Sequence, residues 1–137
     1  MIRADPHAWR AAIARVDAAG GALAVWGVLY EDRYETRFGD GFYLSLRGVA
    51  LSESDARRLA ALAPPGELTH WHVRRYVLVR ADASLRIDAP PAREEEFSVE
   101  DIVAQLCEIA EGGGASKLLV GSGAEGRAPG HNLLSLD

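Results

Sequence analysis

Hydrophobic residues recur every three or four positions in three stretches of the chain, which predicts three amphipathic helices. The first follows Asp5 and Pro6, a typical N-cap and first helical residue, and ends before two glycines. The second follows Ser52 and ends before two prolines, and the third follows Ser98 and ends before three glycines. These predicted helices cover about residues 6–19, 53–63 and 99–111.

The third predicted helix has the clearest division into two arcs. Its apolar arc should face the core and comprises Val99, Ile102, Val103, Leu106, Ile109 and Ala110. Its polar arc should face solvent and comprises Glu100, Asp101, Gln105, Glu108 and Glu111.

Strand-like patterns fill much of the remaining sequence. Residues 22–31 are apolar at both alternating positions, which predicts a central strand covered on both faces. A turn at Glu31–Arg33 and the Gly-Asp-Gly turn at 39–41 would divide Ala22 to Val49 into an antiparallel meander of three strands. Further strands are predicted near residues 69–82, 84–88 and 117–120.

The resulting element order is α-β-β-β-α-β-β-α-β, in which strands come in groups instead of alternating with helices. This order predicts an α+β fold with an antiparallel or mixed sheet of about five to six strands and three helices. The length, 137 residues, predicts a single globular domain over 1–137. We expect the glycine-rich segment from about residue 121 to be flexible.

Charge and composition narrow the classes of partner. The net charge of −5 disfavours binding to nucleic acid or to an anionic membrane, and no apolar run approaches the ~20 residues that span a bilayer. The single cysteine, Cys107, suits a reducing compartment. We therefore expect a cytoplasmic protein that binds neither nucleic acid nor membrane.

A glycine pattern near the C-terminus resembles a dinucleotide-binding fingerprint only in its spacing. Gly121, Gly123 and Gly126 follow the short apolar run 118–120. The fingerprint also needs a helix that begins within it, because helix N-terminal amides hold the pyrophosphate. Pro129 and Gly130 interrupt any such helix, so we predict a connecting loop and no bound cofactor.

His70 and His72 are the strongest candidates for a metal site, since residues two apart on a strand share a face. A zinc ion needs one or two more protein ligands, and the next position on that face is the cation Arg74. We predict no metal, and keep as an alternative a small enzyme or small-ligand site around His70, His72 and Arg74, with Glu35 or Asp40 approaching across the sheet.

The predicted strand 69–82 has two unlike faces. One face carries Trp71, Val73, Arg75, Val77 and Val79 and is expected to lie in the core. The other is basic and aromatic, with His70, His72, Arg74, Tyr76, Leu78 and Arg80. This second face could receive an acidic segment of a partner protein, or could pair within the chain with Glu94, Glu95 and Glu96. Trp26 and Tyr30 are weaker candidates for the same partner.

No catalytic set is recognisable. Cys107 lies at the edge of the apolar arc of its helix, where a cysteine usually packs, and no serine lies in a nucleophile elbow. The element order, small size and acidity resemble those of bacterial secretion chaperones that bind effectors as dimers, which would imply a protein partner and a homodimer. The sequence thus favours a non-enzymatic protein-binding module: an adaptor, a secretion-chaperone-like protein or an immunity-type inhibitor.

Overall fold

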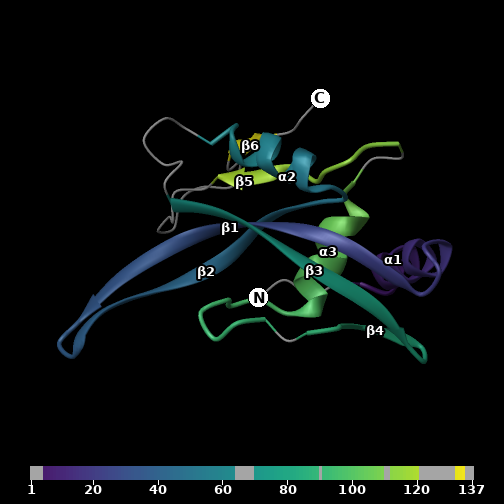
Figure 1. The fold of residues 1–137 in the computed structure, drawn as a ribbon, viewed down its shortest axis with the longest axis horizontal. Helices are drawn as coiled ribbons and strands as arrows, with labels where there is room; N and C mark the ends of the chain where they lie inside the picture. The colour runs from purple at the N-terminus through teal and green to yellow at the C-terminus, as the bar shows by residue number, and fades with distance from the viewer. Residues whose placement is uncertain (1–4, 64–69, 90, 110–111, 121–131, 135–137) are drawn as a thin grey trace.

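The computed structural model describes residues 5–63, 70–89, 91–109, 112–120 and 132–134 (Figure 1). The described part has an α+β fold with three helices and one four-stranded antiparallel sheet of order β2-β1-β3-β4. The elements in chain order are α1 (Pro6–Ala18), β1 (Ala22–Thr36), β2 (Gly39–Ala50), α2 (Glu53–Ala60), β3 (Trp71–Ala81), β4 (Ser84–Ile87), α3 (Val99–Cys107), β5 (Leu118–Val120) and β6 (Asn132–Leu134).

The predicted turn at Glu31–Arg33 is wrong, and with it the three-stranded meander and the exact element order. β1 runs without interruption to Thr36, and its register with β2 opposes Glu31 to Leu44 and Arg33 to Phe42. The main sheet therefore has four strands instead of five or six, and β5 and β6 pair separately. The order on which the resemblance to secretion chaperones rests is accordingly different in the structure.

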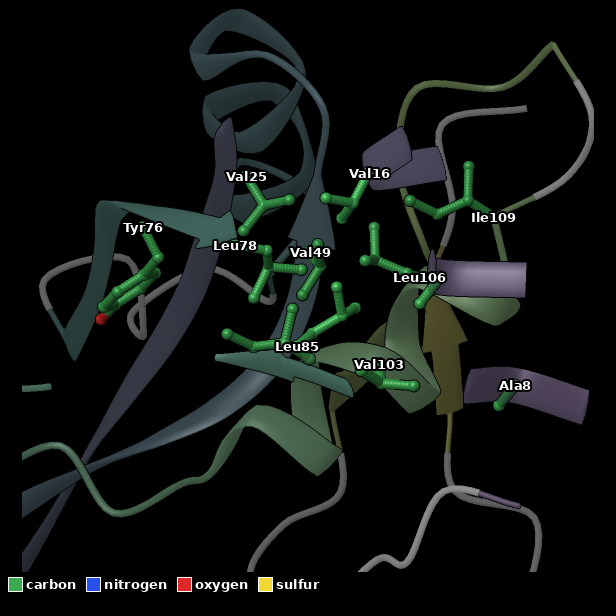
Figure 2. Packing of buried hydrophobic residues seen from close by; sticks show 12 residues of the cluster. Ala8, Val16, Val25, Val49, Tyr76, Leu78, Leu85, Val103, Leu106 and Ile109 are labelled. Atoms are coloured by element: carbon green, nitrogen blue, oxygen red, sulfur yellow. The ribbon is translucent and has the colours of Figure 1, made fainter. Parts of the chain in front are cut away.

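The prediction that β1 is a central strand covered on both faces is confirmed. The larger core lies on the face of Val25, where α1 and α3 pack against the sheet. Figure 2 shows Val16 and Leu106 from these helices directed toward Val25, Leu78 and Val49 of the strands. Burial of such apolar side chains is the main term that stabilises the fold.

The smaller core lies on the opposite face, where α2 and β5 pack against the sheet. Val28, Ala50, Leu59 and Leu118 are fully buried in it, and Trp26, Trp71 and Val73 pack at its border. α1 and α3 thus lie on one side of the sheet in Figure 1, and α2 with the β5–β6 pair lies on the other.

The predicted helix starts are confirmed. The Asp5 carboxylate accepts a hydrogen bond from the amide of Ala8, and the Ser52 hydroxyl accepts one from the amide of Asp55. The Asp101 carboxylate accepts from the amide of Ser98 at 2.8 Å. These contacts satisfy amides that a helix start leaves without an intrahelical partner.

Two predictions for the third helix need correction. α3 ends at Cys107, several residues before the glycines that were expected to end it. Gln105 was placed on the exposed arc, but it is only 8% exposed because it faces β2 and the Glu96–Ser98 segment.

The distal half of the β1–β2 hairpin extends away from the helices. In Figure 1 it reaches to the lower left, beyond the other elements. Pairing of β1 with β3 ends at Tyr30 opposite Trp71, so residues 31–36 of β1 pair only with β2 among the described residues. The turn carries Phe38, which is 91% exposed. The predicted flexible segment from residue 121 and its glycine motif lie outside the described residues, apart from β6.

Candidate functional site

β3 and the segment between β4 and α3 form a polar cluster from residues far apart in the sequence. Glu95 is its centre: its carboxylate accepts hydrogen bonds from Tyr76 Oη at 2.8 Å, Arg74 Nη1 at 3.1 Å and the amide of Ala92 at 2.8 Å. Arg74 also lies 3.5 Å from the Glu94 carboxylate. The side chain of Glu95 is only 3% exposed, so its charge depends on these donors.

The intramolecular alternative is therefore confirmed for Arg74, whose guanidinium pairs with Glu94 and Glu95. Tyr76 and Leu78, expected on a partner-facing surface, instead lie in the larger core. Burial raises the pKa of Tyr76 well above its usual value, and the hydrogen bond to Glu95 raises it further. Tyr76 therefore stays a neutral donor, and it holds the 92–95 segment against the sheet.

The assignment of one core face and one partner face to β3 is wrong because helices cover both faces at different points along the strand. α1 and α3 bury Tyr76 and Leu78, whereas α2 lies over Trp71 and Val73 on the opposite face. Arg75, which was placed on the core face, is exposed.

His72 bonds to a carboxylate that the sequence analysis did not select. Its Nε2 lies 3.0 Å from Glu31 Oε1, and Arg33 Nε donates to the other oxygen of the same carboxylate at 2.6 Å. These hydrogen bonds, that from His72 first, lower the pKa of Glu31. The expected approach of Glu35 or Asp40 does not occur, because these two residues lie opposite each other near the hairpin turn.

The remaining candidates are divided between surfaces. Trp26 lies under the guanidinium of Arg75, 5.8 Å from its ring centre, on the face that α2 covers in part. Tyr30 contacts the rings of Trp71 and His70 at 4.9 and 6.2 Å. Arg80 lies 3.5 Å from Asp17 of α1. The predicted residues therefore do not form one continuous patch.

The edge of β3 is the feature that sequence reasoning missed. β4 pairs with residues 78–81 only, and Asp88 adds one bond, from its amide to the carbonyl of Val77 at 2.8 Å. The carbonyl of Val77 points to the outer edge of β3, and the backbone groups of every second residue point the same way, so those of Trp71, Val73 and Arg75 also point outward. None of the described residues forms a backbone hydrogen bond with these three on that side.

A groove runs beside this open edge. It has a volume of about 370 Å³ and lies between β3 and the segment from Asp88 to Glu95. Its lining residues are Arg74, Arg75, Tyr76, Val77, Asp88, Ala89, Ala92 and Glu95. The one signal in the sequence is the unequal length of the two predicted strands, 69–82 and 84–88. In the structure β3 has eleven residues and β4 has four, so β4 can pair with only part of β3.

Within the ranges given above, no three side chains of His, Cys, Asp or Glu converge, and no helix has the length and apolarity needed to cross a bilayer. Cys107 is a free, partly buried thiol at the margin of the larger core.

Comparison of the chain with protein-family models, with curated proteins and with solved structures finds no match. The geometry of the site therefore carries the functional argument.

Proposed function

We propose that this chain is a non-enzymatic protein-binding module that takes up an extended acidic segment of its partner along the open edge of β3. The observation that carries the proposal is the row of backbone groups at Trp71, Val73 and Arg75, which no other described residue pairs with, beside a groove of about 370 Å³. An added strand would bond to this row, as in other cases of strand addition to a sheet edge.

The side chains at the edge favour a negatively charged segment. Arg75 is exposed, stacks on Trp26 and forms no ion pair in the described part of the chain, so its charge is available to a ligand. Arg74 faces the same groove from the other side of the strand, although Glu94 and Glu95 already neutralise it in part. An acidic side chain at alternate positions of the bound strand would meet Arg75.

The proposal also explains why so much of the edge is left open. Sheet edges usually carry proline, a bulge or a cover that prevents pairing. Residues 71–77 contain no proline, and the β3 register with β1 shows no bulge. Adaptor, chaperone-like and inhibitor functions all need such a segment-binding surface, and the partner decides among them.

The direct test uses a fluorescent peptide that alternates glutamate and valine, with its binding measured by fluorescence anisotropy. A peptide that alternates lysine and valine serves as the control for charge. We expect the acidic peptide to bind and Val73→Pro to abolish that binding, because the amide of Val73 points outward and proline removes this donor without breaking a hydrogen bond to β1. Arg75→Glu should weaken binding more than Arg75→Lys.

Glu35→Pro is the matched control, since it removes an outward amide from a different edge of the same sheet. It should leave peptide binding unchanged. The proposal fails if the two peptides bind equally, if neither binds and tagged protein recovers no stoichiometric partner from its host, or if Val73→Pro binds like the wild type.

A small-ligand or metal site around His70, His72 and Arg74 is the alternative function. Its support is the Nδ1 atom of His70, which is buried and has no hydrogen-bond partner among the residues that the structure describes. Elemental analysis of the purified protein tests it: a bound transition metal that is lost in His72→Ala would favour the alternative.

A further inference from the structure

The distal half of β1 forms a second edge to which no other described strand pairs, separate from the edge of β3. Leu44 of β2 forms backbone hydrogen bonds with Glu94 and Glu96, at 2.7 and 3.0 Å, so its N–H and C=O groups point away from β1. Glu31 lies opposite Leu44, so the N–H and C=O groups of Glu31 point away from β2. The same holds for every second residue after Glu31. The outward backbone groups on residues 31–36 therefore belong to Glu31, Arg33 and Glu35.

Nothing in this segment blocks pairing with another strand. It contains no proline or glycine, and its register with β2 is regular from Leu29 to Thr36. Tyr34 is 47% exposed and its ring lies over Gly41, on the side of β2, which leaves the outer edge of β1 clear. Long regular edges of this kind are templates for strand pairing.

We propose that two copies of this chain pair through this edge, antiparallel and about a twofold axis at Tyr34. Arg33 of each copy then lies opposite Glu35 of the other, and the two Tyr34 residues oppose each other at the axis. The sheets of the two copies join into one continuous sheet. This inference does not depend on the peptide-binding proposal for β3.

The position of β3 limits how far the two hairpins can overlap. Tyr30 is already paired with Trp71, so no strand residue of the second copy can lie opposite Tyr30. In the proposed register the position opposite Tyr30 falls to Phe38 of the second copy, which lies in its turn and has left the strand. A shift that increases the overlap would put Thr36, a strand residue, at this blocked position.

Charge selects the same register. Two edges can form hydrogen bonds only if residues with outward backbone groups lie opposite each other. Other registers about a twofold axis therefore differ from the proposed one by two residues. The shift toward greater overlap opposes Arg33 to Arg33, and the shift toward smaller overlap opposes Glu35 to Glu35. Like charges directly opposite on a sheet are destabilising, so only the proposed register matches unlike charges along the edge.

The isolated hairpin leaves Glu35 poorly neutralised. Glu35 lies opposite Asp40 of β2, which is a like-charge pair, and within the described residues it forms no ion pair. The side chain of Arg33 is 68% exposed, and in the described part of the chain its one ion pair, to Glu31 of its own strand, uses Nε. The terminal nitrogens of the guanidinium can therefore donate to Glu35 of a second copy.

Sedimentation equilibrium tests the proposal. The wild type should show a concentration-dependent mass between 14.7 kDa and twice that value. Arg33→Glu and Glu35→Arg each create two like-charge pairs per dimer and should raise the dissociation constant at least about tenfold. Glu35→Pro should abolish pairing, because it removes an outward amide and leaves the bonds to β2 in place.

Mixing gives the decisive result. An equimolar mixture of Arg33→Glu and Glu35→Arg should form a one-to-one heterodimer, since every opposed pair then joins unlike charges, and the double variant R33E/E35R should dimerise alone. Circular dichroism and thermal unfolding verify that each variant is folded. A wild type that stays monomeric at all concentrations overturns the proposal, as does a dimer that tolerates Glu35→Pro and both reversals.

Discussion

The hydroxyl of Tyr76 on β3 donates a 2.8 Å hydrogen bond to the carboxylate of Glu95, and so joins the sheet to the segment before α3. The ring lies against Gly27 of the neighbouring strand β1, where the absence of a side chain leaves room for it. Figure 2 shows Tyr76 at the margin of the larger core with its hydroxyl directed away from the aliphatic side chains. The residue therefore serves both the core and the polar cluster of Arg74 and Glu95.

Tyr76→Phe should lower the free energy of unfolding by about 1.5–3 kcal/mol, because a buried carboxylate loses one of its donors. Urea unfolding measures the change. Tyr43→Phe is the control, since the Tyr43 hydroxyl forms no hydrogen bond in the described part of the chain, and it should change stability by about 0.5 kcal/mol or less. Equal effects of the two substitutions would contradict the role assigned to the Tyr76 hydroxyl.

Gly27→Ala should destabilise the protein by about 1–3 kcal/mol, the usual cost of an extra methyl group in a packed core. The added Cβ would lie 3.0 Å from Tyr76 Cε2 and 3.1 Å from Leu46 Cδ1. Chemical denaturation of the wild type, the single variants Gly27→Ala and Tyr76→Ala, and the double variant measures the coupling. The cost of the alanine should be smaller when the ring is absent, whereas strictly additive effects would show that ring and glycine do not interact.

Local signals in the sequence were sufficient for the starts of the helices. The side chains of Asp5 and Ser52 each accept a hydrogen bond from the amide three residues later. At the third start the amide of Ser98 donates to the Asp101 carboxylate, so all three contacts are local. The central position of β1 was also predictable, because both alternating faces of residues 22–30 are apolar.

The continuation of β1 through Glu31–Arg33 was not predictable from local signals. Three consecutive charged residues resemble a turn, but residues distant in the sequence form hydrogen bonds with two of them in the strand. Glu31 meets His72 of β3, and Asp32 accepts a hydrogen bond from Ser45 of β2 at 2.6 Å. Cross-strand partners of this kind have no signature in the sequence around the strand.

The open edges depend on where neighbouring strands end, which periodicity alone does not fix. β4 ends before it can cover Trp71–Arg75, and β3 begins too late to cover residues 31–36 of β1. The sequence analysis selected the strand on which the proposed site lies, because β3 is rich in aromatic and basic residues. The sequence analysis selected side chains on one face of β3, whereas the proposed site uses backbone groups at the outer edge of the strand.

Acid should weaken the fold partly through Glu31. Its folded-state pKa lies below the usual 4.5, mainly because His72 and Arg33 donate hydrogen bonds to the carboxylate. The unfolded state therefore takes up the proton first as the pH falls, so this contribution is present above about pH 4.5 and is lost below it. The free energies of unfolding of wild type and Glu31→Gln should therefore converge as the pH falls below about 4.5. A difference between them that does not depend on pH would contradict this role of Glu31. His72→Gln should make the loss less steep, because it removes the principal donor.

Gln105→Leu should stabilise the protein by about 1 kcal/mol, since it removes a buried polar atom that has no partner. Gln105 is 8% exposed, and its Oε1 is buried without a hydrogen bond in the described part of the chain. The side chain lies on α3 beside a hollow of about 560 Å³ that Leu46 and Phe97 also line, so leucine has apolar neighbours there. Gln105→Ala is the size control and should destabilise, because it removes packing along with the amide. Thermal and urea unfolding measure both variants. A leucine variant less stable than wild type would contradict the prediction.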